Sequence, residues 1–126
     1  MHIHSWEQAD LAYEPSYNVK AQRLQRFEGA REPYEGGAWV IVPPNTTMTE
    51  HVNPDGESEL FYVIAGEGEI EVAGERRRVR FGDTIFIPPE QKHLLTNDTP
   101  EPFVFLSLWW GGRRAAATAV GPEVVV

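Results

Sequence analysis

The sequence predicts a single all-β domain, either a sandwich or a barrel. Short apolar or alternating segments recur about every ten residues, and turns rich in glycine and proline separate them. Almost no stretch has the period of an amphipathic helix, and the one weak helical suggestion is 19–27. A chain of 126 residues is long enough for one such core but not for two.

Eight strands are expected, each bounded by turn or loop residues: 38–42, 46–52, 59–64, 69–72, 76–81, 84–87, 93–96 and 103–110. Proline pairs end the first and the sixth, because proline lacks the N–H group that a sheet requires. Pro54-Asp55-Gly56 is a typical turn after the second, and glycine-containing turns follow the third, fourth and fifth. The seventh is short and apolar, and the last is an apolar run whose only polar member is Ser107.

This pattern divides the chain into an N-terminal segment at 1–37, a barrel at 38–112 and a tail at 113–126. The N-terminal segment is mixed and polar, but it carries the aromatic residues Trp6, Tyr13 and Tyr17. We therefore expect it to pack on the barrel or on a partner subunit. The tail is rich in alanine and valine without a clear period, so no secondary structure is assigned to it.

Composition narrows the classes of partner. A net charge of −8 argues against nucleic acid or an anionic membrane as the main partner. The one basic cluster, at 75–80, is expected to be a solvated strand face, with a site for an acidic substrate or partner as the alternative. No apolar run approaches the roughly 20 residues that cross a bilayer. The first residues lack the features of a signal peptide, so a cytoplasmic location is expected.

The absence of cysteine excludes disulfides, thiolate catalysis and sulfur ligands together. Any metal bound by this chain must therefore take nitrogen and oxygen ligands. His2 and His4 would share one face of an extended chain, but a frayed terminus is the simpler interpretation of these two residues.

The stretch from Gly82 to Asn97 resembles the second motif of the cupin family, G-x5-P-x-G-x2-H-x3-N. Gly82, Pro88, His93 and Asn97 all match this motif in register. Only Glu90 departs from it, since Glu90 stands where the motif has its second glycine. That glycine serves a turn, so we expect the departure to affect the loop more than the chemistry.

The first cupin motif, G-x5-H-x-H-x3–4-E-x6-G, is matched in part. Glu59 and Gly66 have the required spacing. His51-Val52-Asn53 occupies the place of the His-x-His element, with Asn53 where the second histidine would be and five residues before Glu59. The leading glycine is absent, because Asn45 stands in its place. The resemblance covers about residues 38–110.

This resemblance implies a jelly-roll β-barrel, the cupin double-stranded β-helix, in which the two motifs face one another. It also implies a metal site of His51, Glu59 and His93. Two imidazoles and one carboxylate suit iron(II), which we favour, and manganese, nickel, cobalt or zinc are alternatives. Glu59 is the one residue we nominate for proton transfer.

Asn53 has three interpretations: a weak fourth ligand, a partner through water, or a cap of the turn. Asp55 and Glu57 are rival carboxylates in the same loop, where solvated side chains are normal.

Side-chain alternation along a strand predicts the pocket beside this site. If Glu59 points inward, so do Phe61 and Val63, whereas Tyr62 points away; His93 and Leu95 likewise share a face. The predicted pocket residues are apolar: Trp39, Phe61, Val63, Phe86, Leu95 and Leu106. Such a lining suits a small aromatic or keto substrate.

The function expected from these features is that of a metal-dependent enzyme acting on a small organic molecule. Oxygen-dependent oxidation ranks first, with metal-assisted isomerisation, cyclisation or dehydration close behind. The alternative is a non-catalytic cupin that binds a sugar or metabolite and has lost the metal, for which the incomplete first motif speaks. Similarity to small cupins also implies a homodimer, to which the N-terminal segment would contribute.

Overall fold

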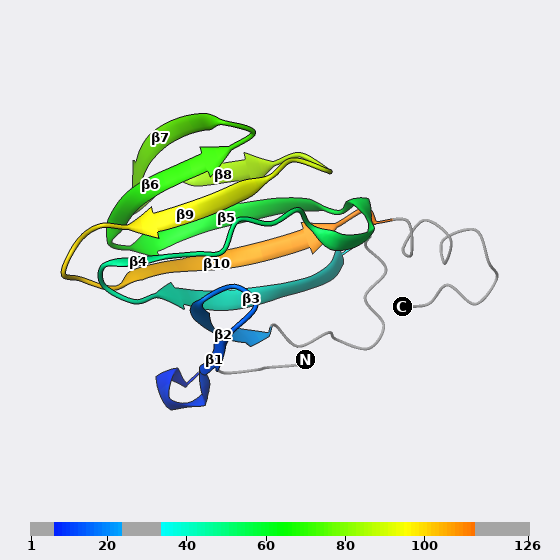
Figure 1. Ribbon diagram of the computed structural model, residues 1–126. Helices are drawn as coiled ribbons and strands as arrows, with labels where there is room; N and C mark the ends of the chain where they lie inside the picture. Colours follow the sequence, from blue (N-terminus) through cyan, green and yellow to red (C-terminus); the bar gives the residue numbers. More distant parts are fainter. Residues whose placement is uncertain (1–6, 24–33, 113–126) are drawn as a thin grey trace.

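A computed structural model describes residues 7–23 and 34–112, and the all-β prediction is confirmed (Figure 1). The strands are β1 (Ala12–Glu14), β2 (Val19–Arg23), β3 (Tyr34–Val42), β4 (Thr46–Thr47), β5 (Ser58–Ala65), β6 (Glu67–Val72), β7 (Glu75–Arg80), β8 (Thr84–Ile87), β9 (His93–Asn97) and β10 (Phe103–Trp110). Two short 3-10 turns, η1 (Gln8–Asp10) and η2 (Pro54–Gly56), complete the described residues. None of these elements is a helix long and apolar enough to cross a membrane.

Two antiparallel sheets form the two layers of the barrel (Figure 1). One has six strands in the order β1-β2-β3-β10-β5-β8, and the other has four in the order β4-β9-β6-β7. The last strand, β10, lies between β3 and β5, so the end of the chain closes the middle of the larger sheet. The strands that carry the two motifs, β5 and β9, belong to opposite layers.

The weak helix prediction for 19–27 is wrong in its described part, because Val19–Arg23 forms strand β2. β2 pairs with β3 in a register that sets Ala21 opposite Val40. Val19 and Ala21 are buried, whereas Lys20 between them is exposed. This alternation has the two-residue period of a strand, which favours a strand over a helix in this segment. Tyr13 and Tyr17 lie on this chain's own barrel; Trp6, His2, His4 and the tail at 113–126 lie outside the described residues.

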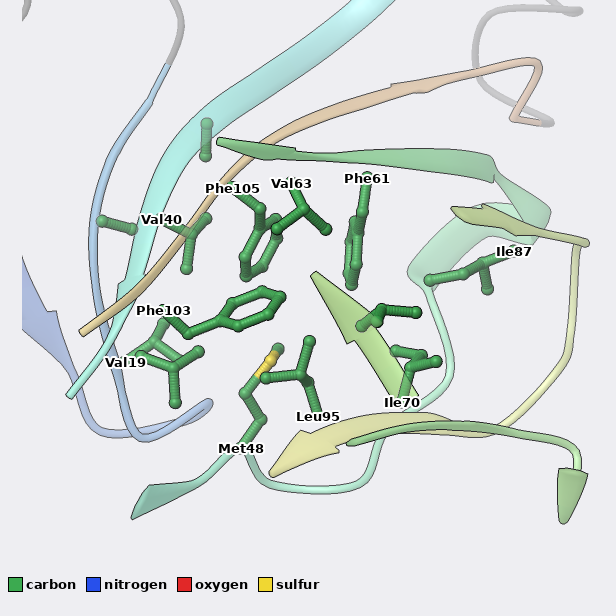
Figure 2. Close-up of a cluster of buried hydrophobic side chains, with 14 residues drawn as sticks. Val19, Val40, Met48, Phe61, Val63, Ile70, Ile87, Leu95, Phe103 and Phe105 are labelled. Carbon is green, nitrogen blue, oxygen red and sulfur yellow. The ribbon is translucent and has the colours of Figure 1, made fainter. Parts of the chain in front are cut away.

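The core fills the space between the layers (Figure 2). Its largest side chains come from both sheets: Phe61, Val63, Ile87, Phe103 and Phe105 from the larger, and Leu95 and Ile70 from the smaller. The rings of Phe61 and Phe105 lie 4.2 Å apart between centroids. The alternation predicted along β5 is present, since Phe61 and Val63 are buried and Tyr62 is 44% exposed.

Gly66 and Glu90 are two of the motif positions that have a left-handed backbone. Gly66 has φ +86°, and a Cβ there would lie 2.5 Å from the carbonyl oxygen of Pro102, so only glycine fits. Glu90, which replaces the motif's second glycine, has φ +65°. The loop therefore keeps the conformation that glycine favours and bears the strain of a side chain in that region.

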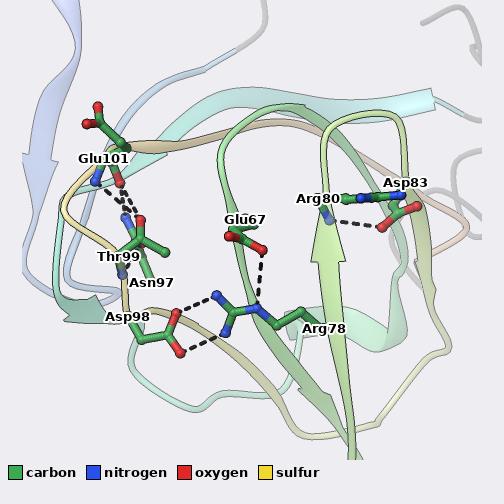
Figure 3. A network of polar contacts seen from close by, with 8 residues as sticks. All are labelled: Glu67, Arg78, Arg80, Asp83, Asn97, Asp98, Thr99 and Glu101. Atoms are coloured by element: carbon green, nitrogen blue, oxygen red, sulfur yellow. Dashed lines mark hydrogen bonds and ion pairs between the residues drawn. The ribbon is translucent and has the colours of Figure 1, made fainter.

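Asn97, the last residue of the second motif, has a structural role (Figure 3). Its side chain is fully buried, and its Nδ2 donates to the carbonyl oxygens of Val42, Pro43 and Glu101 at 3.1, 3.1 and 2.7 Å. Its Oδ1 accepts hydrogen bonds from the backbone N–H and the hydroxyl of Thr99. One amide thus ties the turn between β9 and β10 to the end of β3.

Asn97→Ala should lower the free energy of unfolding by about 3 kcal/mol, because it leaves buried carbonyl groups without donors. Asp98→Ala is the matched control on the next residue. Asp98 is exposed and contacts Arg78 at the surface, so its loss should cost less than about 1 kcal/mol. Urea unfolding measures both variants, and equal losses would contradict the structural role of Asn97.

Candidate active site

A cavity of about 250 Å³ lies on the inner side of the larger sheet. One part of its wall is apolar and includes Phe61, Phe105, Val40 and Met48. The polar side chains that line it come from β1, β2, β5, β10 and the loops beside them: Glu14, Tyr17, Arg23, His51, Asn53, Glu57, Glu59 and Ser107. Three of the four predicted metal ligands, His51, Asn53 and Glu59, therefore line one cavity, whereas His93 does not line it.

His51 and His93 lie side by side because the segment before the η2 turn pairs with the start of β9. Their backbones exchange two hydrogen bonds of 3.2 and 3.0 Å, and their ring centroids are 4.4 Å apart. Each Nδ1 lies within 2.9 Å of the carbonyl oxygen two residues earlier, that of Thr49 or Gln91. A neutral ring that donates from Nδ1 keeps its Nε2 lone pair free. Both rings are thus held in the tautomer that binds ligands through Nε2.

Glu59 projects from β5 toward His93 and is only 8% exposed. Its Oε2 accepts a short hydrogen bond from the hydroxyl of Ser107 on β10. Its Oε1 lies 3.5 Å from His93 Nε2, too far for a good hydrogen bond. Both of these atoms are buried without a hydrogen-bond partner among the described residues. Buried polar atoms seldom lack partners, so this pair points to a missing ligand between them.

Electrostatics around the histidines favour the neutral state of His51. Burial lowers its pKa below the usual value, and the neighbouring imidazole of His93 acts in the same direction. The hydrogen bond to Thr49 and the carboxylate of Glu59 oppose this shift without cancelling it. His51 therefore keeps a free lone pair down to lower pH than a solvated histidine does.

Glu57 is a second carboxyl group in the cavity wall, next to Glu35 and Asp55. Burial raises the pKa of Glu57 to about 7, and a hydrogen bond and negative charge from Glu35 add to this effect. The charges of Asp55 and Glu59 contribute further. A carboxyl group with this pKa can take up or release a proton near neutral pH. It is the group that the sequence ranked only as a rival ligand.

The N-terminal strands supply a wall that the sequence did not reveal. Arg23 closes an ion pair of 2.6 Å with Glu14 and lies 5.7 Å from the ring centroid of Trp109. The ring of Tyr17 meets that of His51 at 4.7 Å. The alternation of β2 was the available signal, but the segment is short and only two of its residues are apolar. The sequence singles out Ser107 as the one polar residue of an apolar strand, but it does not reveal that Ser107 contacts Glu59.

The predicted pocket is corrected in most of its members. Phe61 lines the cavity, but Val63 and Leu95 are fully buried in the core and do not line it. Trp39, Phe86 and Leu106 do not line it either, because the inward positions of their strands belong to their neighbours. Phe86, for example, is 52% exposed.

Trp109 and Trp110 are adjacent on β10, so their side chains point to opposite faces of the sheet. Trp109 lines the cavity, whereas Trp110 lies 6.2 Å from Phe86 between ring centroids.

Imidazole nitrogens and a carboxylate oxygen are suitable ligands for a divalent metal, although the described side chains do not surround one point as a complete set of ligands. Among the described residues, no group of three or more His, Cys, Asp or Glu side chains is arranged so that it could hold a metal ion. The fit rests on the unpartnered Nε2 of His93 and Oε1 of Glu59, with His51 beside them. Asn53 also lines the cavity, and its Nδ2 is buried without a partner in the described part of the chain. The assignment of these four residues as ligands stays a prediction.

The basic cluster of β7 is largely neutralised by its neighbours. Arg76 pairs with Glu71 at 2.6 Å, and Arg77 pairs with Glu75 at 3.0 Å. Arg78 makes two hydrogen bonds to Asp98 (Figure 3). These contacts favour the interpretation as a solvated strand face.

Comparison with known proteins agrees with this architecture. A family model for the cupin domain matches residues 38–109. The structure of the plu4264 protein from Photorhabdus luminescens is 31% identical and superposes with a TM-score of 0.78, over 94% of this chain and 93% of that one. A cupin 2 conserved barrel domain protein from Salinispora arenicola is 29% identical with a TM-score of 0.79, over 95% and 97% of the two chains.

Two further similarities involve only part of the matched protein. The DMSP lyase DddQ from Ruegeria pomeroyi is 28% identical with a TM-score of 0.57, over 64% of this chain and 40% of that one. An uncharacterized protein of Methanocaldococcus jannaschii is 35% identical over 60 residues. That match spans 48% of this chain and about half the length of the curated relative, 47%.

Glu57→Gln should change how stability depends on pH. Because the folded state holds the Glu57 proton more tightly than the unfolded state, this group stabilises the fold fully below pH 4.5, and the contribution is lost as pH rises to about 7. The variant should therefore be more stable than the native protein at pH 8, by about 1 kcal/mol after allowing for solvent screening, and should show no gain near pH 4. Urea unfolding of metal-free protein across this range measures the difference. Glu50→Gln, on an exposed glutamate nearby, is the control, and a gain independent of pH would contradict the assignment.

Proposed function

This chain belongs to the cupin domain family, and we propose that it is a metal-dependent enzyme acting on a small organic molecule in the cavity. One observation carries the proposal: the buried Oε1 of Glu59 and Nε2 of His93 face one another without partners, beside the ring of His51. A purely structural barrel would leave these atoms unexplained, since it is costly to bury a carboxylate oxygen without a hydrogen-bond partner.

The proposed ligands are Nε2 of His51, Nε2 of His93 and Oε1 of Glu59. Iron(II) is favoured because two imidazoles and a carboxylate suit it, with manganese, nickel, cobalt or zinc as alternatives. When bound, such a metal with open positions polarises a carbonyl or enolate, or activates oxygen or water. Asn53 is the neutral fourth candidate. Rotation of its amide by 180° would place Oδ1 where the unpartnered Nδ2 now lies.

The remaining residues prepare the cavity for chemistry. Ser107 holds one oxygen of Glu59 and thereby turns the other toward His93. Phe61, Phe105 and Val40 exclude water from the inner end. Glu57 offers a proton-transfer group near neutral pH, and Glu59 is the other carboxylate that can accept a proton.

Oxidation by an oxygenase-type reaction ranks first for this cavity. Metal-assisted isomerisation, cyclisation or dehydration follows closely, and the similarity to a DMSP lyase supports including elimination reactions in this group. The second candidate is a non-catalytic cupin that binds a sugar or metabolite. Asn53 in place of a histidine favours it, because an amide oxygen is a weaker metal ligand than an imidazole.

Metal analysis decides between the two candidates. Protein purified without added metal should carry close to one divalent ion per chain, and His93→Ala should lose it while the circular dichroism spectrum stays unchanged. The interpretation of Asn53 as a cap of the turn is wrong, because its side chain makes no capping hydrogen bond to η2. Asn53→Ala should weaken binding only if the amide is a ligand. If the native protein binds none of iron, manganese, nickel and zinc, the result would favour the non-catalytic cupin instead.

Ser107→Ala should lower metal affinity by about 10- to 100-fold, because the hydroxyl fixes the orientation of Glu59. Ser107→Thr keeps the hydroxyl at the same place and should recover most of the affinity. Competition with a chelator measures both, and thermal unfolding of the metal-free variants separates binding from folding. Equal metal affinity of the alanine variant and the native protein would show that the hydrogen bond from Ser107 does not orient Glu59 for binding.

A further inference from the structure

Arg23 is the one cationic side chain among the described residues that line the cavity. It continues the inward alternation of β2, after the buried Val19 and Ala21. Its side chain is 51% exposed, so it lies at the open end of the cavity. Arginine side chains are mostly found on the solvated face of a strand. The inward position of Arg23 therefore indicates a role in the cavity.

The sheet register sets Arg23 in one row with the candidate site. Arg23 lies opposite Ala38, and Ala38 lies opposite Ser107. Residues that lie opposite one another share a face of the sheet. Only the methyl group of the buried Ala38 therefore stands between Arg23 and Ser107 along this row. Two strand spacings, roughly 10 Å, separate the two backbones, so one small molecule can contact both the guanidinium and the side of the cavity where Ser107 holds Glu59.

Trp109 holds the guanidinium of Arg23 in place. A Cβ at Gly36, which lies opposite Trp109, would come within 2.7 Å of three atoms of the indole, so the ring lies directly over this glycine. The indole thus extends from β10 across β3 toward β2. There the guanidinium carbon of Arg23 lies 5.7 Å from the ring centroid. A cation–π contact of this kind positions an arginine without using its N–H groups.

Most of the hydrogen-bonding capacity of Arg23 is unused. Among the residues that the structure describes, Glu14 is its one hydrogen-bond partner, and that contact engages Nη2 at 2.6 Å. A guanidinium carries several N–H groups, arranged so that it can bind a carboxylate through two parallel hydrogen bonds. Glu14 therefore occupies part of the guanidinium and leaves N–H groups for a second anion.

We propose that Arg23 binds the carboxylate of a small organic acid whose other end reaches His51 and Glu59. The proposal rests on the function proposed above and names the substrate class for it. The apolar wall of the cavity, with Phe61 and Phe105, suits the hydrocarbon part of such a molecule. Arg23 thus holds the substrate at its charged end and orients the other end toward the candidate site.

The charges around Arg23 favour one carboxylate over a more highly charged anion. Three glutamates, Glu14, Glu57 and Glu59, line the same cavity. Their negative charge repels a dianion such as inorganic phosphate more strongly than a monoanion. Glu14 also competes with any bound anion for the guanidinium, so the affinity of the site depends on this ion pair.

Benzoate and benzamide are matched probes, because they differ in charge but hardly in shape. Titration calorimetry of the full chain, as purified and again after treatment with a chelator, should show benzoate binding at least about 10-fold more tightly than benzamide. Equal affinity for the two probes would overturn the proposal, as would tighter binding of inorganic phosphate than of benzoate. A preference that disappears with the metal would assign the carboxylate to the metal instead of Arg23. A chain that binds no metal but keeps the preference would contradict the metal-dependent enzyme and leave the role of Arg23 standing.

Two substitutions within one ion pair should act in opposite directions. Arg23→Gln should weaken benzoate binding by about 10-fold or more and leave benzamide binding unchanged. Glu14→Gln removes the competing carboxylate, so it should strengthen benzoate binding by about two- to fivefold. Arg77→Gln makes the same change in charge on an exposed arginine that also pairs with a glutamate, and it should have no effect. If Arg23 only ties β1 to β2, both substitutions in the pair weaken binding alike, and that result would overturn the proposal.

A measurement on the unaltered chain avoids any effect of substitution on folding. Phenylglyoxal modifies accessible guanidinium groups, and mass spectrometry locates the modified residues. Benzoate should slow the modification of Arg23 several-fold and benzamide should not, whereas Arg77 should react at the same rate with either probe present. Equal rates at Arg23 with and without benzoate would contradict the assignment.

Discussion

The structure depends on the position of β10 between β3 and β5. Pairing on both sides fixes which side chains of this strand point inward. Phe103 and Phe105 then fill the core, Ser107 meets Glu59, and Trp109 reaches the cavity. A shift of the register by one residue would exchange all of these for the outward set. The core and the candidate site thus both depend on one strand pairing.

The candidate site combines polar groups that are costly to bury with groups that reduce the cost. Glu59 has one oxygen satisfied by Ser107, and both histidines have one nitrogen satisfied by a backbone carbonyl. What stays unsatisfied is concentrated at one place, between Glu59 Oε1 and His93 Nε2. The buried amide of Asn97, by contrast, is satisfied by five hydrogen bonds. This contrast is the physical reason to assign His93 to the candidate site and Asn97 to a structural role.

The sequence was sufficient for the fold class, most of the strands and the direction of side chains along β5, because turns and alternation are local properties. The direction of side chains could not be predicted where a strand carries apolar residues on both faces. The strand that holds Leu106 is apolar at both faces, so nothing local tells inside from outside. The same ambiguity misplaced Trp39 and Phe86. The residues opposite one another across the sheet, such as Ser107 and Glu59, depend on tertiary register, which a single sequence does not contain.

The wall contributed by β1 and β2 has an evolutionary consequence. Glu14, Tyr17 and Arg23 shape the cavity, yet they lie before residue 38, where the match to the family model begins. The strands that present His51, Glu59 and His93 lie within that match. Substitutions in the N-terminal strands can therefore change the shape of the cavity while the candidate site stays the same. Related chains that agree closely over the shared barrel can therefore differ in the shape of their cavities, and residues 12–23 are where that divergence is to be sought.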